Sequence, residues 1–303
     1  MSAPATAHAP AGLDRTEMAH PTTLAEACTV LAQARQAKRA VAILAGGTDM
    51  IVDRHLMPVA KAKTLDLVVD VTGIAELTRI EERTENGERH LVLGGGVTYW
   101  QLREDARVTG AIPMLDVMAK DVGAVQIQTR GTLAGNIATA SPAADGVPAL
   151  MALDGVVKLV KAGGERLVPL EKFFLAYRKT VMEEGELIAS IDVRVPKAGA
   201  RVVWRKVGTR AAQSISKVAL ASVLEIDGGT ITRARFGMAS VAAVTHPLGG
   251  VRALVEGKAA ASPQRAAVDA AIDHEIKPID DVRSTGEYRL HVAKALVWRA
   301  LTS

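Results

Sequence analysis

The sequence predicts an α+β protein in two parts, and three observations support that prediction. Over the first two thirds of the chain, short apolar strands alternate with helical patterns and glycine-rich turns. The last third is different, because three strands of alternating polarity come first and three helical patterns follow them. Between the two parts, residues 196–200 gather proline, glycine and alanine, a composition typical of a domain boundary.

The composition of the 303 residues excludes several classes of protein. Hydrophobic residues make up 49%, which is enough for a sizeable core. The net charge of +4 is too weak and too evenly spread for a nucleic-acid partner, and 3% aromatic residues leave few rings for stacking on bases. No apolar run approaches the roughly 18 residues of a membrane span. We therefore expect a cytoplasmic protein with no nucleic-acid partner and no membrane span.

The reactive side chains predict neither a metal site nor a catalytic nucleophile. The only cysteine, Cys28, falls on the apolar face of a predicted helix, so we expect a small core residue. One thiol cannot form an internal disulfide, nor hold an iron–sulfur cluster without other ligands. The seven histidines lack metal-ligand spacing, and no G-x-S-x-G elbow is present. Residues 1–13 are rich in alanine and proline and lack the features of a signal peptide, which predicts a disordered tail.

The first part of the chain contains several short elements. Thr23 and Glu26 form a capping box in front of a helical pattern, and Thr98 caps a second helix. The residues expected to pack in that second helix are Trp100, Leu102 and Ala106. The other expected elements are a helix at Met50–Leu56 and strands at Val41–Ala45, Leu65–Val71, Leu91–Leu93, Val156–Val160 and Leu187–Val195.

A long segment between Asp121 and Pro148 is rich in glycine, alanine, serine and asparagine. Such segments inside compact domains are usually functional or disordered, and this one is hardly charged, so we expect an ordered, functional loop. A helix should cover Ala143–Leu153 despite Pro148. The elements expected in the last third are strands at Val202–Val207, Val218–Ile226 and Ile231–Ala239, a turn at 227–229, and helices at His246–Val255, Pro263–His274 and Tyr288–Ala300.

A glycine turn joins the first buried strand to the next helix, in the run LAGGTD at residues 44–49. The two glycines let the backbone adopt positive φ and approach a ligand closely. Successive N–H groups can then form a nest for phosphate oxygens, with the Thr48 hydroxyl and the following helix N-terminus beside them. A tight turn without a ligand explains the same residues. The run has neither the lysine of a triphosphate loop nor a full G-x-G-x-x-G pattern.

A second motif, residues 129–145, combines small residues with several hydrogen-bonding side chains. The small residues leave room for a bound group, and the polar ones offer donors and acceptors. The alternative is a capped loop in which Ser141 and Asp145 satisfy helix ends. A weaker run, Gly94 to Gly96, is either part of a site or a flexible turn. The polar side chains of the motif are Thr132, Asn136, Thr139, Ser141 and Asp145.

Together these motifs resemble the flavoprotein (medium) subunits of molybdenum hydroxylases, which include carbon monoxide dehydrogenase and bacterial xanthine dehydrogenase. The resemblance runs from about Arg15 to Ala300, almost the whole chain. Its anchors are residues 45–49 (AGGTD), 127–132 (IQTRGT), 135–145 and 281–289 (DVRSTGEYR). The resemblance implies a PCMH-type FAD-binding fold of two subdomains over 14–196, split near 72. A smaller α/β domain over 200–303, with an antiparallel sheet and helices, would follow.

The same resemblance implies which residues contact FAD. Gly46, Gly47 and Thr48 would hold the pyrophosphate, and no catalytic acid, base or nucleophile is implied. The family usually has a glycine where this chain has Ala134, and alanine there would cost about 1 kcal/mol if the position needs positive φ. The implied contacts are Leu44, Ala45, Gly46, Gly47, Thr48, Asp49, Met50, Ile51, Thr132, Gly135, Asn136, Asp145, Ile188 and Lys206. The sequence around Ile188 and Lys206 is less distinctive, and the alternative for them is an ordinary strand residue and a surface charge.

The resemblance also implies a role in electron transfer. A large molybdopterin-binding subunit would oxidise the substrate, and a small [2Fe-2S] subunit would pass electrons to FAD on this chain, in a heterotrimer or its dimer. The acceptor stays open among NAD, oxygen, quinone and a redox protein. One alternative is a self-sufficient FAD-dependent oxidase or dehydrogenase, although no catalytic cluster is visible in the sequence. Another is a flavin-free scaffold subunit, against which the glycine turn and Thr132 with Asn136 argue.

Overall fold

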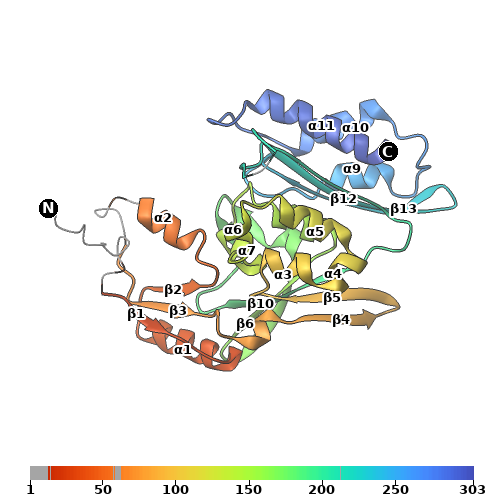
Figure 1. Cartoon of the computed structure of the whole chain (residues 1–303). Coiled ribbons are helices and arrows are strands. Elements are labelled where there is room, and N and C mark those ends of the chain that lie inside the picture. The colour runs from red at the N-terminus through yellow and green to blue at the C-terminus, as the bar shows by residue number, and fades with distance from the viewer. Residues whose placement is uncertain (1–12, 14, 57, 59–62, 212) are drawn as a thin grey trace.

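The computed structural model describes residues 13, 15–56, 58, 63–211 and 213–303. Figure 1 shows three lobes in chain order: an N-terminal lobe from β1 to β3, a middle lobe from β4 to β10, and a C-terminal lobe from β11 to α11. The tail expected at residues 1–13 lies outside the described residues, except for Leu13. Within the described ranges, every helix lacks the length or the apolar character needed to cross a bilayer.

The N-terminal lobe is a small parallel sheet in the order β1-β3-β2, with α1 packed on it. Thr23 caps α1 by accepting a hydrogen bond from the Glu26 N–H, and the Glu26 carboxylate accepts one from the Thr22 N–H at 2.8 Å. The helix buries Cys28, so the expectation of a core cysteine is confirmed. The elements are β1 (Glu17–Ala19), α1 (Leu24–Gln36), β2 (Val41–Leu44), α2 (Met50–Leu56) and β3 (Leu67–Asp70).

The middle lobe is built on an antiparallel sheet in the order β4-β5-β10-β6-β7. Its central strand β10 joins two hairpins, with Ile191 opposite Leu93 on one side and Val157 on the other. The strands are β4 (Ile80–Glu85), β5 (Glu88–Gly94), β6 (Val156–Lys161), β7 (Gly164–Pro169), β8 (Phe174–Ala176), β9 (Lys179–Thr180) and β10 (Leu187–Arg194). The helices are α3 (Tyr99–Glu104), α4 (Ala106–Ala111), α5 (Pro113–Lys120), α6 (Val125–Gln128), α7 (Leu133–Thr139) and α8 (Gly146–Ala152).

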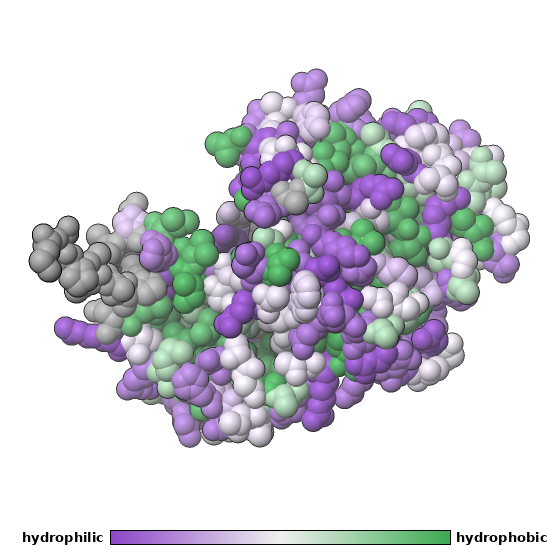
Figure 2. All heavy atoms as spheres, viewed as in Figure 1, coloured by the Kyte–Doolittle hydropathy of each residue, from purple (hydrophilic) through white to green (hydrophobic). Residues whose placement is uncertain are grey.

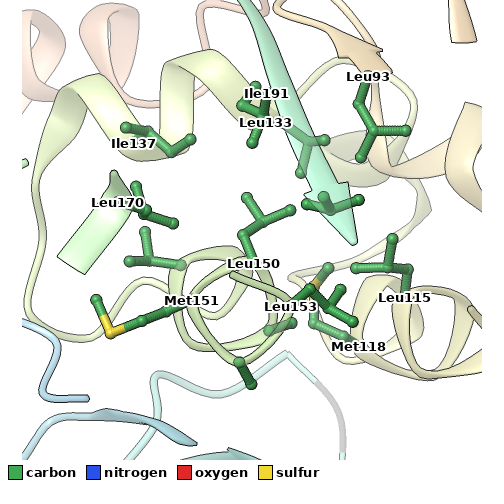
Figure 3. Close-up of a cluster of buried hydrophobic side chains, with 14 of the residues drawn as sticks. Leu93, Leu115, Met118, Leu133, Ile137, Leu150, Met151, Leu153, Leu170 and Ile191 are labelled. Carbon is green, nitrogen blue, oxygen red and sulfur yellow. The ribbon is translucent and has the colours of Figure 1, made fainter. Parts of the chain in front are cut away.

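Apolar side chains fix the position of α7 in this lobe. Leu133 and Ile137 are one helical turn apart, both are fully buried, and Figure 3 shows them facing Leu150 of α8 and Ile191 of β10. Residues on the other side of so short a helix must therefore face outward. Asn136 and Thr139 lie there, on the side that carries the candidate site described below.

The C-terminal lobe is a three-stranded antiparallel sheet between two layers of helices. Figure 1 shows α9, α10 and α11 on one face, and α8 of the middle lobe packs against the other. Gly237 allows this close packing, because a Cβ there would stand 2.2 Å from the Pro148 carbonyl oxygen. The elements are β11 (Arg201–Val207), β12 (Val218–Asp227), β13 (Thr230–Ala239), α9 (Gly249–Val255), α10 (Arg265–Glu275) and α11 (Gly286–Thr302).

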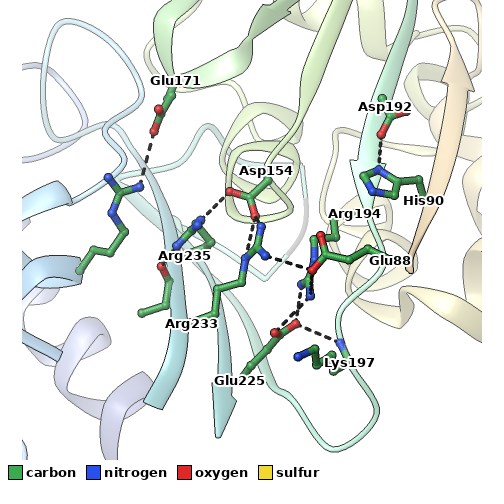
Figure 4. Close-up of polar contacts among 12 residues, drawn as sticks. Glu88, His90, Asp154, Glu171, Asp192, Arg194, Lys197, Glu225, Arg233 and Arg235 are labelled. Atoms are coloured by element: carbon green, nitrogen blue, oxygen red, sulfur yellow. Dashed lines mark hydrogen bonds and ion pairs between the residues drawn. The ribbon is translucent and has the colours of Figure 1, made fainter. Parts of the chain in front are cut away.

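A network of ion pairs joins the middle and C-terminal lobes (Figure 4). At its centre, Arg194 of β10 grips Glu225 of β12 with both terminal nitrogens, at 2.5 and 3.2 Å. These two side chains are only 5% and 4% exposed. The ion pairs of the network are Arg194–Glu225, Arg194–Glu88, Arg233–Glu88, Arg233–Asp154, Arg235–Asp154 and Arg235–Glu256.

The structure confirms the α+β class and the expected elements, with two corrections. The segment from Asp121 to Pro148 is ordered, but it contains α6 and α7 instead of a long loop, because its small residues concealed a helical period. In α3, Tyr99 and Leu102 are buried while Trp100 stays partly exposed beneath the Arg103 guanidinium, so the expected packing was wrong for Trp100. Ala106, also expected to pack, is exposed.

Candidate functional site

The glycine turn after β2 lies directly on another stretch of backbone. A Cβ on Gly46 would stand 2.0 Å from the Arg130 carbonyl oxygen, so only glycine fits at that position. Gly47 has φ of 73°, a conformation that favours glycine for a different reason. The two motifs that the sequence separates by more than eighty residues therefore meet backbone to backbone.

The start of α7 is held by the segment that follows β5. The Leu133 N–H donates to the Val97 carbonyl at 3.1 Å, and the Tyr99 N–H donates to the Gly131 carbonyl at 3.2 Å. Thr132 caps the helix by accepting from the Gly135 N–H at 3.0 Å, which leaves its own hydroxyl proton free to be donated elsewhere. These bonds fix the outward face of α7 relative to the glycine turn.

The glycine run after β5 serves close backbone approach. A Cβ on Gly94 would stand 2.2 Å from the Leu77 carbonyl oxygen, and one on Gly95 would stand 2.2 Å from the Ile188 carbonyl oxygen. The explanation as a flexible turn is therefore wrong, because the run is locked between neighbouring strands and loops. Gly95 and Gly96 also line a small cavity beside Ile188.

Three adjoining cavities run along the glycine turn and α7. The central one, of about 380 Å³, shares Asn136 and Thr139 with a larger cavity of about 1040 Å³ between the middle and C-terminal lobes. At its other end it shares Ala45 and Gly135 with a narrow apolar cavity of about 90 Å³. Figure 2 shows the surface hollowed between the N-terminal lobe and the rest of the molecule. The arrangement suits an elongated ligand with one apolar end.

The structure brings most of the predicted site residues to these cavities. Asp145 lines the large interlobe cavity and Ile188 lines the apolar one. Ile51 and Lys206 line none of the three. The central cavity is lined by ten of the predicted residues: Leu44, Ala45, Gly46, Gly47, Thr48, Asp49, Met50, Thr132, Gly135 and Asn136.

Lys206 reaches the site through Asp145. Its ammonium lies 2.5 Å from the Asp145 carboxylate, and the Ser216 hydroxyl donates to the other carboxylate oxygen at 2.5 Å. The Lys206 side chain is 7% exposed, so its explanation as a surface charge is wrong. Burial raises the pKa of Asp145, and the attraction of Lys206 opposes that rise only in part. The Asp145 side chain makes no helix-capping bond, so the capped-loop alternative is wrong for Asp145, whereas the Ser141 hydroxyl does accept a local bond from the Ala143 N–H at 3.3 Å.

Some lining residues are missing from the implied FAD contacts, among them Thr139, whose hydroxyl the sequence had already singled out as a donor. Thr139 donates a hydrogen bond to the Asp49 carboxylate at 2.7 Å and so links the two motifs across the central cavity. Tyr99, Val122 and Ile127 line the same cavity. The signal for Tyr99 was present, because the capping box of Thr98 makes it the first residue of α3, next to the glycine run. Nothing local in the sequence distinguishes Val122 or Ile127 from core residues.

Two protein-family models match consecutive parts of the chain. Residues 14–198 match the model of the FAD binding domain in molybdopterin dehydrogenase, and residues 204–303 match the CO dehydrogenase flavoprotein C-terminal domain. This chain belongs to that flavoprotein family. It carries an FAD-binding domain and is a component of an oxidoreductase.

Relatives of similar length support the assignment. The chain is 28% identical over 300 residues to the carbon monoxide dehydrogenase medium chain of Hydrogenophaga pseudoflava, covering 95% of this chain and 96% of that one. It is 30% identical over 215 residues to the nicotinate dehydrogenase FAD-subunit of Eubacterium barkeri, covering 68% of each. A solved structure of the Hydrogenophaga carbon monoxide dehydrogenase superposes with a TM-score of 0.84 at 27% identity, over 95% of this chain and 96% of that one.

The residues at the cavities fit FAD. Backbone at the glycine turn is open to close approach, and the adjoining cavities suit an elongated cofactor. Two buried polar atoms at the central cavity, the Tyr99 hydroxyl and Asn136 Oδ1, have no hydrogen-bond partner in the protein. Buried polar groups without partners are rare in native structures, and both of these side chains line the central cavity.

The alanine at position 134, where the family usually has a glycine, does not strain the backbone. It lies in the first turn of α7 and is absent from the residues with positive φ. Alanine is therefore compatible with the backbone, and the cost expected for a positive φ does not arise.

Proposed function

We propose that this chain is the FAD-binding subunit of a molybdenum hydroxylase and relays electrons from the [2Fe-2S] clusters of a partner subunit to an acceptor. The observation that carries the proposal is the string of three cavities, with unpartnered polar atoms in the middle, in a chain of this family. FAD accepts single electrons and releases a pair, which suits a relay between clusters and a two-electron acceptor. The protein binds and orients the cofactor and excludes water from it.

We assign a contact with FAD to each group of residues around the cavities. The glycine turn would offer its backbone N–H groups to the pyrophosphate, while Asn136 and Thr132 supply side-chain hydrogen bonds. Lys206 would act by holding Asp145 in place. We further propose an FAD-binding domain over 14–196 and a C-terminal domain over 200–303. The proposed FAD contacts are Leu44, Ala45, Gly46, Gly47, Thr48, Asp49, Met50, Ile51, Thr132, Gly135, Asn136, Asp145, Ile188 and Lys206.

The proposed partners follow from what one chain can hold. With one cysteine, this chain cannot ligate a pair of [2Fe-2S] clusters by itself, so a small [2Fe-2S] subunit and a large molybdopterin-binding subunit would complete a heterotrimer or its dimer. Relatives named as medium chain and FAD-subunit support such an assembly. The acceptor remains one of NAD, oxygen, quinone or a redox protein.

The test is a pull-down of the tagged chain from its native source, with flavin, iron and molybdenum analysis. The proposal expects two co-purifying partners together with FAD, iron and molybdenum. A chain that carries FAD alone and turns over a small organic substrate would support a self-sufficient flavoenzyme instead. A chain without flavin absorbance bands would support a scaffold subunit.

A further inference from the structure

Tyr99 is buried at the back of the central cavity with no partner for its hydroxyl. It is the first residue of α3 and only 2% exposed, and its ring packs over Gly131, where an added Cβ would meet two ring carbons at 3.5 Å. The hydroxyl oxygen is fully enclosed and makes no hydrogen bond to the protein. A buried hydroxyl without a partner costs about 1–3 kcal/mol, so its presence here calls for a function.

The oxygen of the Asn136 carboxamide, in a second side chain of the same cavity wall, is equally unpartnered. Both atoms border the same point in space, because a Cβ on Gly146 would stand 2.8 Å from Asn136 Oδ1 and 2.9 Å from the Tyr99 hydroxyl. Any other residue at position 146 would therefore displace this pair. Asn136 itself sits where the central and interlobe cavities join.

We infer that Tyr99 is a positioning residue of the cofactor site: when the cofactor binds, its hydroxyl donates a hydrogen bond to Asn136 Oδ1, a bond that is absent in the FAD-free chain. That bond directs the Asn136 amide N–H groups into the cavity, where they donate to an oxygen of the cofactor. Both atoms lie within reach of the same Cβ position, and the last side-chain torsion of Asn136 has a broad energy profile, so rotation about it can turn Oδ1 toward the hydroxyl. The inference rests on the proposed function, and it adds a residue to the predicted FAD contacts.

The chemistry of the pair determines which way the amide points. A carboxamide has nearly the same shape in its two flipped orientations, so a fixed neighbour must choose between them. Burial, followed by the nearby carboxylates of Asp145 and Asp49, raises the pKa of Tyr99 well above its ordinary value. The hydroxyl therefore stays protonated at every working pH and favours the amide oxygen, which leaves the amide donors for the ligand.

The test is a double-mutant cycle on the full-length chain, with FAD affinity measured by flavin fluorescence. Tyr99→Phe should weaken FAD binding about tenfold, or about 1.4 kcal/mol. Asn136→Ala should weaken it more, and Tyr99→Phe should then have no further effect, because its partner is gone. The melting temperature of the FAD-free Tyr99→Phe variant should stay the same or rise, since the change removes an unsatisfied buried hydroxyl. Tyr288→Phe on α11, where Tyr288 is 42% exposed, is the matched control and should leave both readouts unchanged.

Three outcomes would overturn the inference. FAD affinity could be unchanged in Tyr99→Phe, the loss could be equal with and without Asn136, or the FAD-free variant could melt at a much lower temperature. The second outcome would mean that Tyr99 acts independently, and the third that its role is purely structural. A wild-type chain that fails to bind FAD would instead overturn the proposed function, so the two failures are distinguishable.

Discussion

On the side that faces β12 and β13, the middle lobe buries charged groups that pair with opposite charges, whereas along α7 it buries polar atoms without partners. Arg194 and Glu225 illustrate the first side, with two hydrogen bonds between them and further partners around each. Tyr99 and Asn136 illustrate the second. The difference lies in the ends of the side chains: Arg194 leaves only its Nε without a partner, whereas the Tyr99 hydroxyl and Asn136 Oδ1 have none at all.

The first side packs against the C-terminal lobe, and the second lines the cavities proposed to hold the ligand. A buried charge that is paired within the chain holds two lobes at a fixed angle and needs nothing else. An unpaired polar atom that is buried at a cavity is a cost the folded chain bears until a ligand arrives. The four changes below test the two sides separately, in order of decreasing effect.

Arg194→Ala should destabilise the chain by about 3–5 kcal/mol, because it leaves the Glu225 carboxylate buried without its charge partner. Urea denaturation of the FAD-free chain measures this effect, and FAD affinity of the folded protein should hardly change. Lys120→Ala is the control, since it breaks a pair with Asp116 in which the lysine is 53% exposed and should cost under about 0.5 kcal/mol. Similar losses for the two variants would contradict the assigned role of the network.

Gly47→Val should abolish FAD binding in a chain that stays folded, with affinity reduced at least a hundredfold, or about 2.8 kcal/mol. The added side chain requires a strained backbone at φ of 73°, and its Cβ would stand 3.2 Å from the Leu44 side chain and 3.4 Å from that of Ile51, so the turn must change shape. Gly87→Val is the matched control, because Gly87 has φ of 78° in the β4–β5 turn with open space around it. Thermal melting should show a loss of stability in both variants, the smaller one in Gly87→Val, which should keep full FAD affinity. Full flavin occupancy in Gly47→Val would contradict the pyrophosphate assignment.

Lowering the pH should change the stability contributions of Glu225 and Asp145 in opposite directions. Burial alone raises the pKa of Glu225, but hydrogen bonds from Arg194 and from the Lys197 N–H outweigh it and hold that pKa below 4.5. Its stabilisation is therefore complete above pH 4.5 and is lost as the pH falls through the lowered pKa. The pKa of Asp145 is raised above 3.8, so its protonation favours the folded state as the pH falls.

Urea denaturation at a series of pH values below 5 checks this opposition. Glu225→Gln should flatten the acid loss of stability, and Asp145→Asn should steepen it. Equal slopes in both variants and the wild type would show that neither carboxyl is linked to folding in the stated way.

Ala134→Gly should have the smallest effect, a loss of about 0.5–1 kcal/mol in stability with FAD affinity unchanged. The position is helical, so glycine adds only backbone entropy to the unfolded chain. Thermal melting with and without FAD measures both quantities. Tighter FAD binding in the glycine variant would show that alanine restricts the site after all.

Features encoded locally were predictable from the sequence, and those that depend on long-range packing were not. The caps at Thr23 and Thr98 and the glycine turn after β2 each depend on a few neighbouring residues, and the structure has them where they were expected. The fit of Gly46 against the Arg130 carbonyl has no local signature, because it joins segments far apart in sequence.

The misplaced packing in α3 has the same origin. Trp100 is the larger and more apolar choice on size alone, but the angle at which α3 meets Gly131 and Gly146 turns Tyr99 inward instead. That angle is set by the Tyr99 N–H bond to the Gly131 carbonyl, a tertiary contact. The ion-pair network escaped prediction likewise, since each arginine alone resembles a solvated surface charge.

The central place of β10 has a consequence for how the protein is made. It is the last of the five strands in its sheet to be synthesised, so the hairpins β4–β5 and β6–β7 have no common partner until Leu187–Arg194 has left the ribosome. Lys206, which compensates Asp145, emerges later still. Because pairings between distant segments form late, cofactor insertion must follow the synthesis of about two thirds of the chain. Loading of the flavin is therefore a late maturation step, set by chain order.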